Sequence, residues 1–142
     1  MKLYWSPQSR SFTALWALGE AGISYDRERI DIRNGGQKAP AFRAINPMGK
    51  VPVLVDEGVV VTETAAICAH IADRVANPQL APLPGSPERG AYYRWLFFAP
   101  SCVEPAYTQK HAGMEVDSHA AGWGSLEAVL DTLDGALAAA DP

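Results

Sequence analysis

The chain has 142 residues, of which 48% are hydrophobic and 20% are charged, so it can form one ordinary domain or a small domain with part of another. A formal net charge of −4 without a block of Lys or Arg argues against nucleic acid as an obligate partner. No apolar run reaches the ~18 residues that span a bilayer, and the apolar stretch at the start of the sequence is too short for a secretory signal. We therefore expect a cytoplasmic protein with no membrane partner.

The two cysteines, Cys68 and Cys102, each lie in an apolar helical pattern, which predicts buried, inert thiols. The sequence has no C-x-x-C motif, which removes thioredoxin-type dithiol exchange from the possible activities. His70, His111 and His119 fall in different segments, so we expect no metal site.

The first part of the chain predicts a βαβ unit. Residues 2–5 form a short aromatic strand that Ser6-Pro7 ends, and residues 25–32 give a weaker strand signal. Two strands joined by a helix in this way are expected to be parallel. Gly22 ends the intervening helix, whose apolar positions recur at spacings of three and four, namely Phe12, Leu15, Trp16 and Leu18.

A hairpin and a helix follow. Residues 39–45 predict a short helix or irregular turn, which ends at Asn46-Pro47. Residues 51–55 and 59–61 are β-branched runs separated by Glu57-Gly58, a pattern that predicts a hairpin. The apolar spacing after the hairpin predicts a helix from about Thr64 to Ala76.

The second half of the chain reads as helical. Residues 78–87 contain four prolines and one glycine, which predicts a linker between residues 1–77 and a helical region, residues 88–142. Pro100 and Pro105 should kink or end the first of these helices. Apolar stripes are predicted on both helices, with Ala91, Trp95, Phe98, Ala99 and Cys102 on the first and Leu126, Val129, Leu130, Leu133 and Leu137 on the second. These stripes have little to pack against.

Four separated elements in the first domain carry a resemblance to a known family. The stretch Asn46-Pro47-x-Gly49-x-Val51-Pro52, the following hairpin, the Glu63-Thr64 pair and the helix after it occur in a fixed order. This order resembles the glutathione-binding domain of cytosolic glutathione S-transferases of the serine type. The resemblance implies an α/β thioredoxin-like domain followed by an all-α domain, which here is short for the family. We expect either a fragment or truncated product, or a partner that covers the exposed helices.

The resemblance places a thiol-binding residue in the first loop. Ser9 falls at the position whose hydroxyl holds the glutathione sulfur as a thiolate, and Ser11 is the second candidate. In cysteine-type bacterial relatives the thiol falls at Arg10, so that chemistry is absent here. Judged without the family, these serines are better explained as caps of the first helix, a role that either could fill.

Val51 and Pro52 are expected at the cysteinyl part of glutathione. A cis Val51-Pro52 bond would leave the backbone of Val51 open to pair with an extended ligand, as the resemblance implies. On local sequence alone, a trans proline on an edge strand is the more frequent structure, since only ~5–6% of X–Pro bonds are cis.

The remaining contacts to glutathione are assigned by the same resemblance. Thr64 would bind the γ-glutamyl carboxylate through its N–H and hydroxyl, and Glu63 the ammonium group. The alternative is an ordinary helix start, with Thr62 as N-cap and Glu63 as a first-turn acid. The glycyl carboxylate needs a cation or an amide, for which the candidates are Gln37, Lys38 and Lys50.

The function that the resemblance implies is conjugation of glutathione, as co-substrate, to a small electrophile. The acceptor would lie near Trp95, Tyr107, His111 or Met114, although core packing explains these residues equally well. Family members usually form homodimers. The alternatives are a non-catalytic module that binds glutathione or another ligand, and a glutathione-dependent isomerase or dehalogenase.

Overall fold

The computed structural model of the chain describes residues 1–75, 80–117 and 119–140. It divides into two compact units, residues 1–89 (the N-terminal unit) and residues 90–142 (the helical unit). The predicted helix end at Ala76 and the first part of the predicted linker lie outside the described residues. In the part of the chain that the structure describes, no helix is long and apolar enough to cross a membrane.

The N-terminal unit contains a four-stranded mixed sheet with the order β2-β1-β3-β4. Strand β1 pairs in parallel with β2 and antiparallel with β3, and β3 pairs antiparallel with β4. The predicted parallel pair and the predicted hairpin are therefore confirmed. The strands are β1 (Lys2–Trp5), β2 (Asp26–Arg29), β3 (Val53–Asp56) and β4 (Val59–Val61).

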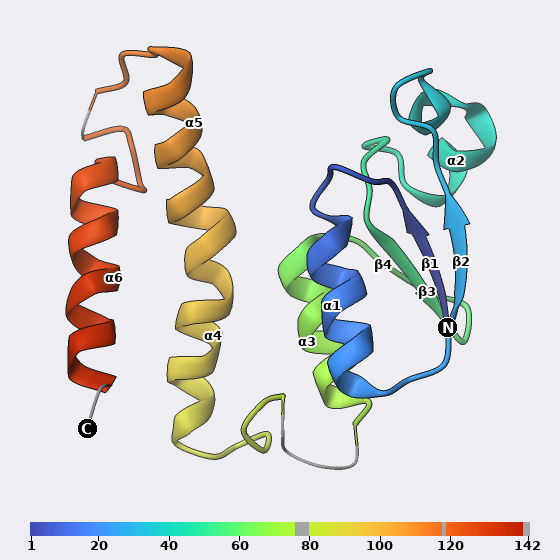
Figure 1. The fold of residues 1–142 in the computed structure, drawn as a ribbon, viewed down its shortest axis with the longest axis horizontal. Coiled ribbons are helices and arrows are strands. Elements are labelled where there is room, and N and C mark those ends of the chain that lie inside the picture. The colour runs from blue at the N-terminus through green and yellow to red at the C-terminus, as the bar shows by residue number, and fades with distance from the viewer. Residues whose placement is uncertain (76–79, 118, 141–142) are drawn as a thin grey trace. The chain divides into compact units, whose positions relative to one another are not determined.

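Helices α1 (Ser11–Ala21) and α3 (Thr64–Asp73) lie side by side against the sheet (Figure 1). Side chains alternate between the two faces of a strand, so Leu3 and Leu54, which are directly opposite in the β1–β3 register, both point to these helices. The buried cluster there consists of Leu3, Ala14, Leu18, Leu54, Ile67 and Ile71. It forms the main core of the unit.

A smaller cluster covers the other face of the sheet. Val53 and Ile30 pack there against Phe42 of the short helix α2 (Pro40–Ile45), which follows the 3₁₀ helix η1 (Gly36–Lys38). Tyr4 joins this cluster, and its ring centroid lies 5.9 Å from that of Phe42. The short helix predicted over residues 39–45 is confirmed. The chain is thus an α/β layer structure of the thioredoxin-like type in its N-terminal unit.

The apolar face predicted for α1 is wrong in two positions. Phe12 and Trp16 are 59% and 71% exposed, whereas Ser11, Ala14 and Leu18 are buried. The predicted positions Leu15 and Leu18 do contact the core, so the periodicity found part of the packed face but misplaced Phe12 and Trp16. Ser11 and Ala14 are small, and small side chains let the helix backbone approach the sheet and α3 closely.

The helical unit is built from one interrupted helix and a second helix. The chain runs through α4 (Glu88–Phe98), a π-helical turn η2 (Ala99–Val103) and α5 (Glu104–Ala112), and α6 (Leu126–Ala140) follows. Pro100 lies at the start of the π-helical turn and Pro105 at the start of α5. A proline cannot donate the helical hydrogen bond, so the predicted interruption at these residues is confirmed.

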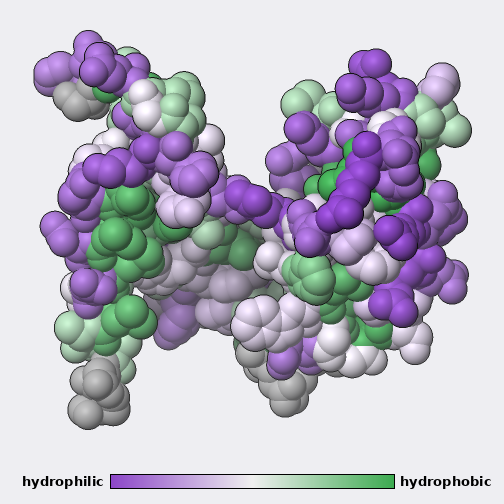
Figure 2. Space-filling model, turned by 45° about the horizontal axis from the view of Figure 1, so that its top comes forward, coloured by the Kyte–Doolittle hydropathy of each residue, from purple (hydrophilic) through white to green (hydrophobic). Residues whose placement is uncertain are grey.

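The helical unit leaves apolar side chains exposed. Of the five residues in the predicted α6 stripe, Val129 is buried, whereas Leu130 and Leu137 are 49% and 69% exposed. Figure 2 shows hydrophobic surface on this unit. The expectation that its helices have little to pack against agrees with these exposures.

The packed face of α1 gives a direct test by paired substitutions. We expect Leu18→Ala to lower the free energy of unfolding by ~2–5 kcal/mol, because it leaves a cavity in the main core. Phe12→Ala, on the same helix, should change it by less than ~0.5 kcal/mol, because Phe12 is exposed. Urea unfolding followed by circular dichroism measures both changes. Equal losses in the two variants would contradict the assigned face.

Candidate functional site

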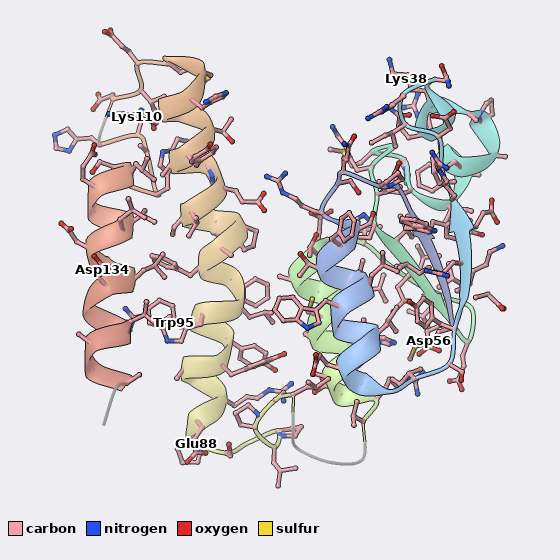
Figure 3. The ribbon with its side chains drawn as sticks, in the orientation of Figure 1. Lys38, Asp56, Glu88, Trp95, Lys110 and Asp134 are labelled. Atoms are coloured by element: carbon pink, nitrogen blue, oxygen red, sulfur yellow. The ribbon has the colours of Figure 1, made fainter. Side chains whose placement is uncertain are left out.

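The elements that carry the predicted site residues meet at one end of the sheet. Strands β1 and β2 are parallel and end together, and β3, being antiparallel to β1, begins at that same end. Figure 3 places Lys38 at this end of the N-terminal unit and Asp56, the last residue of β3, toward the opposite end. In open α/β sheets, ligands bind outside the carboxyl ends of the parallel strands. We refer to this end as the loop end of the sheet.

The loop between β1 and α1 is held together by its serines. The Ser11 Oγ accepts the Ser6 N–H at 3.2 Å, and the Ser9 Oγ accepts the Ser11 N–H at 3.1 Å. The Ser9 hydroxyl donates either to the Ser6 carbonyl oxygen at 2.7 Å or to the Ser11 Oγ at 2.8 Å. Gln8 adopts a positive φ of 55°, which turns the chain between Ser6 and Ser9.

These contacts separate the two serine candidates. Ser11 is completely buried, so a bound thiol has no access to its hydroxyl. Ser9 is partly exposed, and its proton has a choice of acceptors. Its oxygen also accepts the N–H of Ser11, the first residue of α1, although the N-cap residue of this helix is Arg10, which makes no side-chain cap. A hydroxyl can accept from that N–H and still donate to a ligand, so the two interpretations of Ser9 are compatible.

The turn before β3 is fixed by Asn46. This residue is buried, and its Nδ2 donates to the Lys50 carbonyl oxygen at 2.9 Å, while its Oδ1 accepts the Met48 N–H at 3.1 Å. Gly49 has a φ of 61°, and a Cβ at this position would lie only 2.8 Å from the Gln37 carbonyl oxygen. A glycine is therefore required here, and its close approach brings Lys50 near Gln37.

The Val51-Pro52 bond is cis, as the family resemblance implies. Pro52 is buried and Val51 is half-buried, and β3 begins at the next residue. The trans bond that local sequence alone favours is therefore wrong.

Lys38, the third candidate for the glycyl carboxylate, is exposed and is the last residue of η1.

The start of α3 is not an ordinary capped helix end. The helix begins at Thr64, and the N-cap residue is Glu63, with a φ of 65° and a ψ of 124°. No described side chain caps this terminus, so the interpretation of Thr62 as the N-cap is wrong. A non-glycine residue in this region of φ and ψ is strained, and such residues cluster at functional sites. The helix therefore presents N–H groups that a ligand carboxylate can satisfy.

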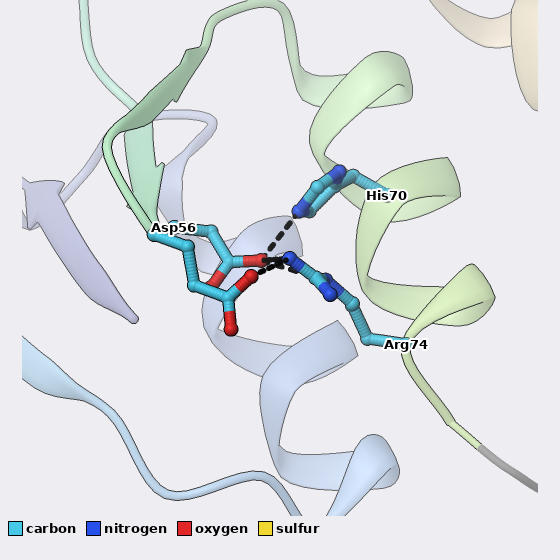
Figure 4. Close-up of polar contacts among 4 residues, drawn as sticks. Asp56, His70 and Arg74 are labelled. Atoms are coloured by element: carbon cyan, nitrogen blue, oxygen red, sulfur yellow. Dashed lines mark hydrogen bonds and ion pairs between the residues drawn. The ribbon is translucent and has the colours of Figure 1, made fainter.

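A partly buried ion-pair cluster around Asp56, which the sequence reasoning missed, lies where β3 ends (Figure 4). The Asp56 carboxylate is hydrogen-bonded to the His70 Nε2 at 2.8 Å and accepts from the Arg74 Nε at 2.8 Å. These contacts, led by the bond to His70, hold the pKa of Asp56 below its ordinary value against the opposing effect of burial. The spacing of His70 and Arg74, four residues apart, was the available signal. The cluster joins the hairpin to the C-terminal end of α3.

Comparisons with known proteins show the family to which the chain belongs. Residues 1–73 match the sequence model described as the glutathione S-transferase, N-terminal domain. Glutathione S-transferase 3 of Zea mays is 33% identical over 97 residues, which are 68% of this chain and 44% of the relative. Maleylacetoacetate isomerase of Pseudomonas aeruginosa is 37% identical over 97 residues, 63% of this chain and 46% of that protein.

A solved structure is also similar. A sphingomonad glutathione S-transferase complexed with glutathione is 35% identical, with a TM-score of 0.76, and the match covers 97% of this chain and 70% of that one. The chain therefore belongs to the glutathione S-transferase family. It spans less than half the length of the two curated relatives named above.

The Asp56 cluster predicts a pH dependence of stability. Because the pKa of Asp56 in the folded chain lies below its ordinary value of 3.8, its contribution is complete above about that pH and is lost as the pH falls further. We expect Asp56→Asn to lower the free energy of unfolding at pH 7 and to flatten its decline below pH 4. Urea titrations at several pH values between 7 and 3 measure the free energy of unfolding of both proteins.

The matched control for this substitution is Asp26→Asn, on the exposed strand β2. It should follow the pH dependence of the parent more closely than Asp56→Asn does. An Asp56→Asn variant with the parental stability and the parental acid dependence would contradict the role of the cluster.

Proposed function

We propose that the chain binds glutathione at the loop end of the sheet and takes part in its conjugation, through the sulfur, to a small electrophile. The observation that carries this proposal is the convergence of three features at that end. These are the partly exposed Ser9 hydroxyl, the cis Val51-Pro52 bond and the strained, uncapped start of α3 at Glu63-Thr64. Each suits a different part of an extended, anionic peptide.

The peptide would be bound by backbone and charge. Val51 pairs with the cysteinyl portion as one more strand-like segment, and its N–H and C=O groups face that portion. Thr64 gives its N–H and its hydroxyl to the γ-glutamyl carboxylate, which the positive end of the α3 dipole also favours. Glu63 accepts from the γ-glutamyl ammonium. The glycyl carboxylate is bound near the turn before β3 by the amide of Gln37 and the ammonium groups of Lys38 and Lys50.

Ser9 acts on the sulfur. When its hydroxyl rotates away from the Ser6 carbonyl, it can donate to a thiolate, and a hydrogen bond to an anion lowers the pKa of the thiol. The thiol proton leaves to solvent. The sulfur then forms a bond to the electrophilic carbon, whose leaving group departs with the electron pair of the broken bond. No general base is required, because the nucleophile is already ionised.

Two other functions have a specific observation in their favour. The Ser9 proton already has acceptors within the loop, which favours a module that binds glutathione without activating it. The similarity to a maleylacetoacetate isomerase favours an isomerase that uses the same bound thiolate.

We further propose, on the basis of the family alone, that the protein is a cytoplasmic homodimer. The residues expected near an acceptor from the sequence, Trp95, Tyr107, His111 and Met114, all lie in the helical unit, where the last three are exposed.

Ser9→Ala and Ser11→Ala test the proposed chemistry as a pair. Ser9→Ala should leave glutathione affinity nearly unchanged and raise the pKa of the bound thiol by about one to two units, because one charge-assisted bond of ~1.5–3 kcal/mol is lost. Ser11→Ala should leave that pKa unchanged and lower stability by ~1–3 kcal/mol, because the buried Ser6 N–H loses its acceptor. Ultraviolet titration of the bound thiolate and urea unfolding measure the two effects.

If neither variant shifts the pKa of the bound thiol, the loop is structural, and the non-catalytic module becomes the better function. A shift in Ser11→Ala alone would move the thiol-binding role to Ser11.

The start of α3 gives a second test. Glu63→Ala and Thr64→Ala should each weaken glutathione binding by ~1.5–3 kcal/mol, because each removes a charge-assisted contact to the γ-glutamyl group. They should not affect binding of the des-γ-glutamyl analogue, cysteinylglycine. Titration calorimetry with both peptides measures the difference. Variants that still prefer glutathione over cysteinylglycine as strongly as the parent does would rule out this placement of the peptide.

A further inference from the structure

A hollow opens at the loop end of the sheet between the loops that follow β1 and β2. Its lining residues come from the carboxyl ends of these two parallel strands, and they are Ser6, Pro7, Gln8, Arg29, Asp31, Ile32 and Arg33. Its volume is about 240 Å³, which is below the size of a pocket for a whole small molecule. The hollow therefore suits one group of a larger ligand.

The hollow carries an excess of positive charge. Arg29 and Arg33 line it together with a single carboxylate, Asp31. The Oδ1 of Asp31 lies 3.2 Å from the backbone N–H groups of both Arg33 and Asn34, and its Oδ2 accepts from the Asn34 Nδ2 at 2.7 Å. These bonds, led by that from the Asn34 side chain, hold the pKa of Asp31 below its ordinary value. Asp31 is thus ionised and already satisfied by its own turn.

Arg33 is positioned by the first loop. Its Nη2 donates to the Gln8 Oε1, which holds the guanidinium against the loop that also carries Ser9. A guanidinium has five N–H donors in a planar fork, so this bond leaves the others available to an anion. Pro7 and Ile32 add apolar walls beside the charge. A carboxylate attached to an apolar or aromatic group matches this combination.

We propose that this hollow binds the carboxylate of the electrophilic substrate, so that the chain prefers acceptors that carry a negative charge. The inference rests on the proposed transfer from glutathione. It assigns the hollow to the acceptor because none of the candidates for the glycyl carboxylate, Gln37, Lys38 and Lys50, lines it. The hollow also shares Ser6 with the Ser9 hydroxyl, which lies 2.7 Å from the Ser6 carbonyl oxygen and would hold the reacting sulfur.

Two aryl chlorides that differ in charge provide the test. 1-Chloro-2,4-dinitrobenzene is neutral, and 4-chloro-3,5-dinitrobenzoate carries a carboxylate. In both reactions the C–S bond forms, the C–Cl bond breaks, chloride leaves with the electron pair and the thiol proton passes to solvent. Arg33→Gln should raise the KM for the benzoate about three- to tenfold, the size of one partly solvated charge contact, and leave the KM for the neutral chloride unchanged.

The matched control is Arg27→Gln. Arg27 lies on the same strand as Arg29, but its guanidinium lies over the Trp5 ring, 5.9 Å from the centroid, and it does not line the hollow. The Arg27→Gln variant removes the same charge and should leave both KM values unchanged.

The double variant Arg29→Gln/Arg33→Gln should abolish the preference for the benzoate. The preference in the parent should shrink with added salt, since partly exposed charges are screened.

A binding measurement separates this inference from the proposed function. Titration calorimetry with 3,5-dinitrobenzoate and with 1,3-dinitrobenzene needs no turnover, and Arg33→Gln should weaken only the benzoate. If neither chloride is turned over but this difference persists, the transferase proposal fails and the anion site stands. A higher KM for glutathione with both chlorides in Arg33→Gln would assign the hollow to the glycyl carboxylate and overturn the inference. Unchanged benzoate binding in the double variant would also overturn it.

Discussion

The packing of Leu3 against Leu54 is the contact on which the rest of the N-terminal unit depends. These residues are directly opposite on β1 and β3, both are fully buried, and both face the helices α1 and α3. A slip of β3 by one residue against β1 would turn Leu54 to the other face of the sheet and away from Leu3. The register therefore determines which loops meet at each end of the sheet.

That register brings distant segments to the loop end. The loop after β1 carries Ser9, the antiparallel β3 begins there after Val51-Pro52, and the return of the chain through β4 leads to the start of α3 at Glu63. At the opposite end, Asp56 binds His70 and Arg74 and joins the hairpin to α3. The helix is thus attached at its C-terminal end, and its uncapped N-terminus is left available for a ligand.

Much of this fold could be predicted from the sequence because local patterns and tertiary packing agree. The valine runs on either side of Glu57-Gly58 form the predicted hairpin, since both turn residues adopt the positive φ that a two-residue turn requires. The face of α1 was predictable only in part. Leu18 is buried as predicted, but Phe12 and Trp16 are exposed, and the rest of the packed face uses small residues, which hydrophobic periodicity does not detect.

The sequence alone could not assign a role in the candidate site where two residues of the same type offer the same chemistry. Ser9 and Ser11 have the same chemistry and the same capping propensity, and only the fold shows that Ser11 is buried. The hollow between the β1 and β2 loops was also not predictable, because Arg33 lies far from Gln8 in the sequence and is brought to it by the pairing of β1 with β2.

The central claim is that glutathione binds at the loop end of the sheet. Titration of isotopically labelled chain with glutathione, followed by amide chemical shifts, tests it most directly. The account predicts that the amides of Ser9, Val51 and Thr64 shift together on one binding curve, and that those of Asp56 and His70, at the other end, do not. Shifts confined to α5 and α6, or no shifts at millimolar glutathione, would contradict it.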